Sequence, residues 1–246
     1  MKLFLLSLLC LGSLTTASRY VAYIDDLTGW WDTSILEAMG VPGYTKKPHP
    51  YNVLILSFYL SNGNAADALT DKKNIYIVFF FFNYYLFDNN NRQNFNTDTQ
   101  KKICNCSNPT ADSFRQGLLN IYHSHGIKLL MSCFGSTDFP TSSVNAHTLG
   151  NNIATYVKTY KLDGVDIDWE DSSTFESGTG LGENWLTNLT SSIRSGLPSS
   201  DGYIITHAPQ APYFANKANY AKGAYLTVHK NVGSSINWYN LQFYNQ

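Results

Sequence analysis

The stretch that decides the fold is Leu162-Asp163-Gly164-Val165-Asp166-Ile167-Asp168-Trp169-Glu170, in which acidic and apolar side chains alternate. Because a β-strand repeats every two residues, Asp166, Asp168 and Glu170 are expected on one face, with Val165, Ile167 and Trp169 on the other. Like charges packed so closely favour a shared proton, so at least one carboxyl pKa is expected to be raised. A raised carboxyl pKa suits a general acid that works near neutral pH.

Two other interpretations of this stretch are an exposed acidic edge strand and a calcium-binding loop. Calcium loops favour Asp, Asn and Gly on a flexible turn with a late bidentate Glu. Here β-branched and aromatic residues separate the acids, which favours a buried strand. No metal site is predicted here or at Cys104 and Cys106, which are one residue apart and have no His pair at zinc-ligand spacing nearby.

The acidic pattern resembles a known family signature. Asp163-x-x-Asp166-x-Asp168-x-Glu170 is similar to the D-x-x-D-x-D-x-E motif of family-18 glycoside hydrolases, the chitinase family. The resemblance implies that Glu170 donates a proton to the glycosidic oxygen, and that Asp168, supported by Asp166, orients the N-acetyl group of the substrate. Asp163 and Gly164 would begin the motif structurally. In such substrate-assisted chemistry the acetamido oxygen replaces an enzyme nucleophile, so no cofactor is expected.

Two further segments carry the resemblance. Ser132 and Gly135 match the family's S-x-G-G pattern, although Phe134 stands where the first Gly is usual. Near the end of the sequence, Gln242-Phe243-Tyr244-Asn245 resembles the Q-F-Y-N motif of the fungal and plant class III branch. This implies that Tyr244 hydrogen-bonds the acetamido carbonyl and that Asn245 replaces an Asp of other branches. The period of two in a strand sets Gln242 on the same face as Tyr244, and we expect Gln242 and Asn245 to bind the substrate.

Other aromatic and histidine residues have two interpretations each. Trp30 and Trp31 follow the first expected strand, so they either bind sugar at the active face of the sheet or pack where a helix meets it. His207 in the fifth expected strand either points toward the acids or is a structural residue.

Strand and helix patterns alternate along the chain and predict a parallel α/β architecture. Expected strands cover residues 19–24, 52–60, 128–135, 162–170, 203–208 and 238–245. Expected helices cover residues 113–125, 145–160 and 183–197, the last with Trp185 in the core. The family resemblance implies a TIM (β/α)8 barrel of which about six βα units are present. We therefore expect a C-terminally truncated catalytic domain over residues 18–246 that is inactive as written.

The N-terminus has the layout of a secretory signal peptide over residues 1–17, with cleavage expected after Ala17. A membrane anchor is the alternative, but the apolar run is shorter than the ~20 residues that a span needs. Glycosylation sequons at Asn105 and Asn188 fit an extracellular protein. Without Cys10, an odd number of cysteines would remain, which hints at a missing partner.

The segment from about residue 71 to residue 108 is an atypical low-complexity insertion, rich in Lys, Asn, Ile, Tyr and Phe. Its composition is typical of A- and T-rich codons, so we interpret it as a translated intron, with a genuine lineage-specific loop as the alternative. Clustered aromatic residues on a surface would promote aggregation, which proteins generally avoid.

The composition is that of a soluble globular chain: 43% of the 246 residues are hydrophobic, 14% are charged and the net charge is -1. No Lys/Arg cluster indicates nucleic acid, and neither a membrane partner after signal cleavage nor an oligomer is expected. The expected substrate is chitin or another N-acetylglucosamine polysaccharide. Alternatives are an endo-β-N-acetylglucosaminidase acting on N-glycans, a noncatalytic lectin, and an inactive truncated product.

Overall fold

The computed structural model describes residues 19–24, 52–63, 97–215 and 220–244. Its centre is one sheet of six strands in the order β1 to β6, and every neighbouring pair is parallel. The strands are β1 (Val21–Ile24), β2 (Val53–Tyr59), β3 (Lys128–Phe134), β4 (Gly164–Asp168), β5 (Ile204–His207) and β6 (Trp238–Tyr239). The predicted parallel α/β architecture is therefore confirmed.

The sixth strand is the one clear error in the predicted strands. We expected it over residues 238–245, but β6 contains only Trp238 and Tyr239. The chain then continues as an irregular segment that keeps a single bridge, between Gln210 and Gln242. Alternation of apolar residues cannot distinguish a regular strand from an extended segment that makes only isolated backbone hydrogen bonds to its neighbour.

Helices follow most of the strands. They are α3 (Thr97–Cys104), α4 (Ala111–Ser124), α5 (Ala146–Thr159), α6 (Ser172–Glu176), α7 (Leu181–Gly196) and α8 (Ala224–Val232). Short 3-10 turns cover Ser199–Asp201, Ala211–Phe214 and Gly233–Ser235. The three predicted helices correspond to α4, α5 and α7, whereas α3, α6 and α8 were not predicted.

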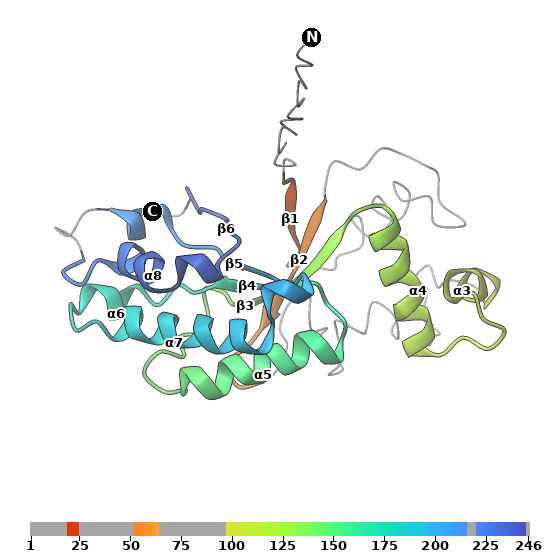
Figure 1. Ribbon diagram of the computed structural model, residues 1–246, viewed down its shortest axis with the longest axis horizontal. Helices are drawn as coiled ribbons and strands as arrows, with labels where there is room; N and C mark the ends of the chain where they lie inside the picture. The colour runs from red at the N-terminus through yellow and green to blue at the C-terminus, as the bar shows by residue number, and fades with distance from the viewer. Residues whose placement is uncertain (1–18, 25–51, 64–96, 216–219, 245–246) are drawn as a thin grey trace, which may run out of the picture.

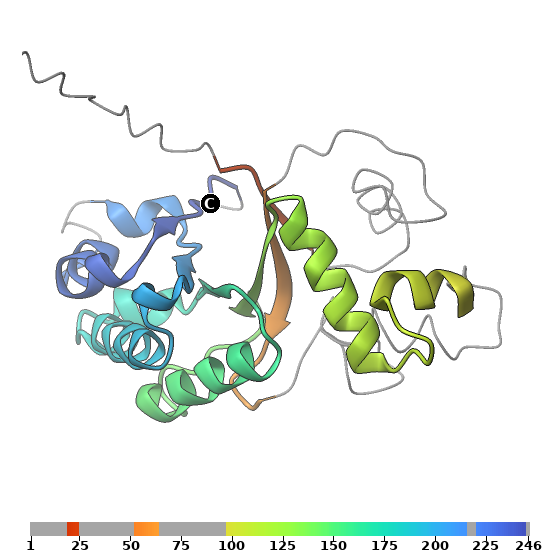
Figure 2. The same cartoon turned by 45° about the vertical axis from the view of Figure 1, so that its right-hand side comes forward.

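The arrangement of these elements is that of part of a barrel wall. Figures 1 and 2 show α5, α7 and α8 side by side on one side of β1 and β2, and α3 and α4 on the other. Within the described part of the chain, β1 and β6 are the two edges of the sheet. The sheet is therefore open here, with its strands in the sequential order of a (β/α)8 barrel.

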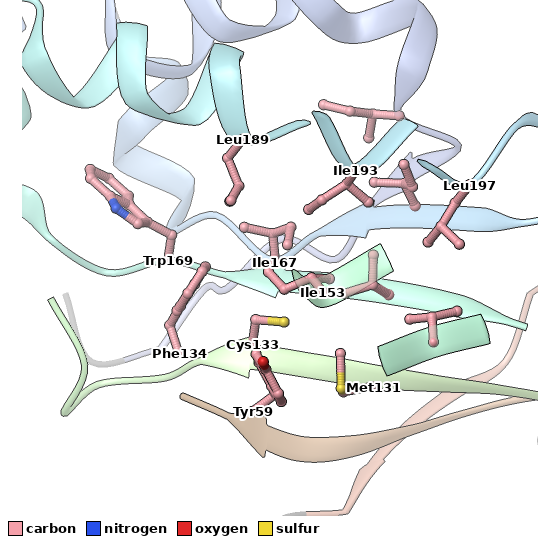
Figure 3. Packing of buried hydrophobic residues seen from close by; sticks show 14 of the residues in the cluster. Tyr59, Met131, Cys133, Phe134, Ile153, Ile167, Trp169, Leu189, Ile193 and Leu197 are labelled. Carbon is pink, nitrogen blue, oxygen red and sulfur yellow. The ribbon is translucent and has the colours of Figure 1, made fainter. Parts of the chain in front are cut away.

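The main core lies between the sheet and helices α5, α7 and α8 (Figure 3). Ile153 from α5 and Leu189 and Ile193 from α7 pack toward Ile167 of β4, and all four are fully buried. Trp185 is also buried, as predicted, and its Nε1 donates to the carbonyl oxygen of Val144. This layer fixes the outer face of β4, so its acidic face must point to the inside of the sheet.

Helix α3 and a disulfide occupy the end of the predicted insertion. Cys104, the last residue of α3, is bonded to Cys106, while Cys133 is buried with a free thiol. Helix α4 then begins with a capping box in which Thr110 and Ser113 satisfy each other's backbone N–H groups. Residues 64–96, which hold most of the insertion, lie outside the described residues.

No helix in the described ranges is both long enough and apolar enough to cross a membrane. The predicted signal peptide lies outside these ranges.

Candidate active site

The acidic face of β4 forms the centre of the site. All five residues of this strand are buried, and Val165 and Ile167 belong to the core beside the helices. Asp166 and Asp168 therefore point to the opposite, inner face of the sheet. Glu170 follows two residues after the strand and is half-buried. Its position beyond the C-terminal end of a strand is where βα barrels carry their chemistry.

Asp166 is fully buried and accepts four side-chain hydrogen bonds. Its Oδ1 accepts from Thr206 Oγ1 at 2.5 Å and from Asn240 Nδ2 at 3.0 Å. Its Oδ2 accepts from Tyr23 OH at 2.9 Å and from Ser132 Oγ at 3.0 Å. Burial raises the pKa of Asp166, and these four donors counteract that rise because they stabilise the ionised form.

Asp168 is the group that holds a proton at neutral pH. Burial, followed by the negative charges of Asp166 and Glu170, raises its pKa to about 8. Gln242 Nε2 donates to its Oδ1 at 2.6 Å and opposes the rise. The crowding of like charges expected from the sequence thus contributes to the raised pKa of Asp168, and burial is the larger cause.

Glu170 sits at the open end of this row. Gln210 Nε2 lies 3.5 Å from its Oε2, and a hydrogen bond between the Asp168 and Glu170 side chains contributes to the raised pKa of Asp168. The backbone oxygen of Glu170 accepts from the backbone N–H of Ser172 at 2.8 Å, at the start of α6. The three acids therefore form a row from the deeply buried Asp166 to the half-exposed Glu170, with a side-chain hydrogen bond between Asp168 and Glu170.

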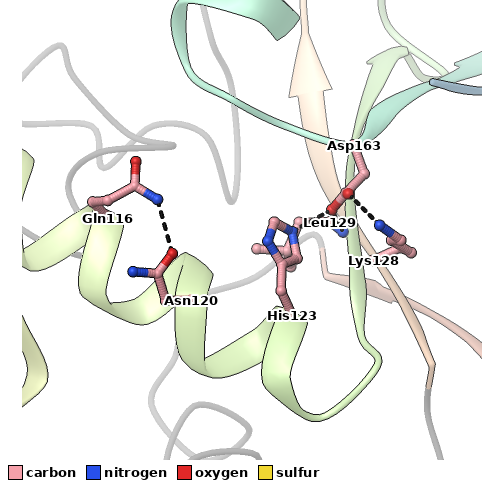
Figure 4. A network of polar contacts seen from close by, with 6 residues as sticks. All are labelled: Gln116, Asn120, His123, Lys128, Leu129 and Asp163. Atoms are coloured by element: carbon pink, nitrogen blue, oxygen red, sulfur yellow. Dashed lines mark hydrogen bonds and ion pairs between the residues drawn. The ribbon is translucent and has the colours of Figure 1, made fainter. Parts of the chain in front are cut away.

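Asp163 and Gly164 hold the entry to β4. Asp163 accepts from the Lys128 ammonium and lies against His123 Nε2, each at 2.8 Å, and also accepts from the backbone N–H of Leu129 at 2.9 Å (Figure 4). A Cβ at Gly164 would overlap the carbonyl group of Ile204 in β5. Both residues position β4 against its neighbouring strands, at the end of the strand opposite Glu170.

Ser132 and Gly135 come from β3 and the turn after it. Ser132 touches Asp166 directly, as described above. Phe134 has φ +82° and Gly135 φ +73°, so both lie in the left-handed region. This conformation explains why glycine is usual at the Phe134 position. Phe134 compensates by burying its ring completely and packing edge-to-face on Trp185.

The C-terminal motif divides into a buried and an exposed part. Gln242 is buried against Asp168 and also donates to the carbonyl oxygen of Ala208 at 2.9 Å. Tyr244 is 63% exposed, and the regular strand on which Gln242 and Tyr244 were expected to share a face ends earlier, at Tyr239. Asn245, Trp30 and Trp31 lie outside the described residues.

His207 does not join the acids. Its register partner is Ile167, so it points to the helix side of the sheet, where Tyr225 OH lies 3.0 Å from Nδ1 and Thr190 Oγ1 lies 3.2 Å from Nε2. Burial lowers the pKa of His207 to about 3, which keeps the ring neutral. The structural interpretation of this residue therefore applies.

Three partners of Asp166 were not singled out from the sequence: Tyr23, Thr206 and Asn240. Thr206 pairs with Asp166 in the register of β4 and β5, so strand alignment would have placed it there. Asn240 precedes Gln242 by two residues, and period two from Gln242 points to it. Tyr23 carries no such signal because strand β1 is sequentially remote.

The carboxylates lie at the C-terminal end of parallel strands, where βα-barrel enzymes carry their active sites. The chain belongs to the Glycosyl hydrolases family 18, whose family model matches residues 19–246. The resemblance inferred from the acidic motif is thereby confirmed.

Relatives with known names support this placement. The chain is 33% identical over 132 residues to proteins named Endochitinase 4 from Metarhizium anisopliae and from Metarhizium robertsii. The match covers 49% of this chain and 45% and 37% of those proteins, so this chain matches less than half of their length.

Solved structures give the same fold. A family-18 chitinase from Pseudoalteromonas aurantia superposes with a TM-score of 0.62 and 25% identity, over 93% of this chain and 69% of that one. The C-terminal domain of Legionella pneumophila ChiA, at 16% identity, superposes with a TM-score of 0.52 over 93% of this chain and 58% of that domain. The described sheet thus corresponds to part of a TIM barrel.

Proposed function

We propose that this protein is a secreted endo-acting hydrolase that cleaves β-1,4 linkages of chitin by a substrate-assisted, retaining mechanism. The observation that carries the proposal is the row Asp166, Asp168 and Glu170, in which a buried, four-fold hydrogen-bonded carboxylate adjoins one that holds a proton at neutral pH. Membership of family 18 and the similarity to proteins named chitinases support chitin as substrate.

Glu170 is proposed as the proton donor. It is the half-exposed member of the row, so it can reach a substrate, and it shares a hydrogen bond with the protonated Asp168. Because the pKa of Asp168 is raised to about 8, the hydrogen-bonded pair of Asp168 and Glu170 holds a proton near neutral pH that Glu170 can donate. After the leaving group departs, the carboxylate of Glu170 would activate water as a base.

Asp168 is proposed to orient the N-acetyl group of the substrate. In this step the acetamido oxygen attacks the anomeric carbon and the glycosidic bond breaks, while the leaving oxygen takes the proton of Glu170. The positive charge that develops on the acetamido group would then be stabilised by the negative charge of the acidic row behind it. Tyr244, Gln242, Asn245, Trp30 and Trp31 are proposed to contact the sugar.

Secretion is part of the proposal. It is supported by the signal-like N-terminus and by the sequons at Asn105 and Asn188, both of which are exposed. Protease protection of a microsome-translated precursor and its shift in mass after deglycosylation would test it.

The test of activity compares two forms of the protein and two substrates. The 246-residue chain is secreted beside a version extended by two further βα units, since a closed (β/α)8 barrel has two more strands than the described sheet. Each is incubated with chitotetraose and with a high-mannose glycoprotein. We expect cleavage of chitotetraose by the extended form. Cleavage of the glycoprotein alone would replace chitin by N-glycans, and cleavage of neither would contradict the proposed function.

A further inference from the structure

Asn240 is the side chain from which a new role follows. It comes directly after β6, and its backbone N–H donates to the carbonyl oxygen of His207 at 2.8 Å. Its side chain crosses the inner face of the sheet and donates from Nδ2 to Asp166 Oδ1 at 3.0 Å. Two residues later, Gln242 donates to Asp168 Oδ1 at 2.6 Å. One short segment thus places an amide on each of two neighbouring acids.

The orientation of the Asn240 amide is fixed by a third residue. Trp238 Nε1 donates to Asn240 Oδ1 at 3.0 Å. An indole N–H can only donate, so the atom that faces it must be the amide oxygen. The NH2 group therefore faces Asp166, and exchanging the two amide atoms would set two donors against each other at Trp238.

Asn240 differs from the other partners of Asp166 in what it can accept. The hydroxyl groups of Tyr23, Ser132 and Thr206 can each donate to an ionised carboxylate or rotate to accept from a protonated one. The NH2 group of Asn240 only donates. A proton on Asp166 Oδ1 would then face a donor that cannot turn away, on a carboxyl group that is fully buried.

We propose that Asn240 is a positioning residue that holds Asp166 in its ionised form, so that the proton of the acidic row stays on Asp168 and Glu170. Asn240 acts through Asp166 and does not touch the sugar. The role deepens the proposed function, because a proton trapped on the deepest acid would be out of reach of a glycosidic oxygen. It applies to the acidic row itself, whichever sugar is bound.

The other titratable groups near Asp166 do not compete for its proton at working pH. The titratable groups whose charges interact with Asp166 are Tyr23 from β1 and Asp168 from β4 on the same face of the sheet, and Cys133 from β3 and Tyr225 from α8 on the helix side. Burial raises the pKa of Tyr23, Cys133 and Tyr225 well above their usual values, so these three stay neutral between pH 5 and about 8. The proton can therefore be distributed only between Asp166 and its acidic neighbours in this range.

The test is a carboxyl-carbon NMR titration of the full chain labelled with 13C at aspartate. The variants are Asn240→Leu, which keeps the size and removes the donor, and Asn240→Asp, which puts a like charge against Asp166. Asn231→Leu on the exposed side of α8 is the matched control. Resonances of Asp166 and Asp168 are assigned by their disappearance in Asp166→Asn and Asp168→Asn.

We expect the midpoint of Asp166 to rise by about one pH unit in Asn240→Leu, as loss of one hydrogen bond to a charged group implies. The rise should be larger in Asn240→Asp and absent in Asn231→Leu. If the Asp166 midpoint is the same in the wild type and in both Asn240 variants, the role is overturned. If one variant does not fold, the other still gives this result. Failure of the proposed function would appear as absent cleavage of chitotetraose, which this titration does not measure.

Discussion

Replacing Asp168 by asparagine should remove a loss of stability that the wild type shows as the pH rises from 6.5 to 8. Asp168 is 7% exposed, and its pKa in the folded protein is about 8, compared with an ordinary value of 3.8. The folded state therefore binds this proton more tightly than the unfolded state does. A group of this kind stabilises the fold while it is protonated, and stability is lost as the pH rises toward the folded pKa.

The magnitude follows from this difference. Between pH 6.5 and pH 8 the unfolded Asp168 is fully ionised, whereas the folded one goes from protonated to half ionised. At about 1.4 kcal/mol per pH unit, and with the flattening near the midpoint, the wild type should lose about 1.5 kcal/mol from this group. Asparagine cannot ionise and still offers an oxygen to Gln242, so the variant should not show this loss.

Equilibrium denaturation at pH 6.5 and pH 8 measures the effect. The difference between wild type and Asp168→Asn is the relevant quantity, because changes from His207, Cys133 and other groups cancel in it. Asp201→Asn, at an exposed position in a 3-10 turn, is the control and should follow the wild type. Parallel losses of stability in wild type and Asp168→Asn would refute a raised Asp168 pKa.

Three further perturbations test the site and its support. Glu170→Gln should lower cleavage of chitotetraose by the extended form ~10²- to 10⁴-fold and should leave sugar binding unchanged. The control, Glu176→Gln at the exposed end of α6, should change neither cleavage nor binding. Steady-state rates measure cleavage, and calorimetry measures binding. Thr206→Val should lower the free energy of unfolding by about 1.5–3 kcal/mol, because Asp166 loses a donor, and equal stability of the Val and Ser variants would contradict that. Gly164→Ala should cost more than about 3 kcal/mol or prevent folding, because its Cβ meets the backbone of β5, so a near-wild-type melting temperature would refute this packing.

The sequence allowed the acidic row and most of the sheet to be predicted because strand signals are local. The motif from Asp163 to Glu170 fixes one strand with its two faces, and the apolar runs around Leu54, Leu130 and Ile205 mark its neighbours. Helices α5 and α7 carry clear apolar stripes. These features depend on residues a few positions apart, which periodicity can detect.

The unpredicted features depend on contacts across the fold. Asn240 and Tyr23 meet Asp166 over sequence separations of 74 and 143 residues, which local patterns do not encode. Strand β6 ends early because its backbone stops making regular hydrogen bonds to β5 after Tyr239. The following segment up to Gln242 keeps the alternation of a strand but makes only one bridge. Helix α8 begins after Gly223 with Glu183 of α7 accepting from the backbone N–H of Ala224, a tertiary contact in place of a local cap.

The anomeric form of the first product tests most directly whether Glu170 serves substrate-assisted cleavage of chitin. Chitotetraose is incubated in an NMR tube with the 246-residue chain, with the form extended by two βα units, and with Glu170→Gln in the extended form. The proposed chemistry predicts that new reducing ends from the extended form appear first as the β-anomer and that Glu170→Gln produces almost none, because net retention follows from attack by the acetamido oxygen and then by water. Initial formation of the α-anomer, or undiminished cleavage by Glu170→Gln, would contradict it.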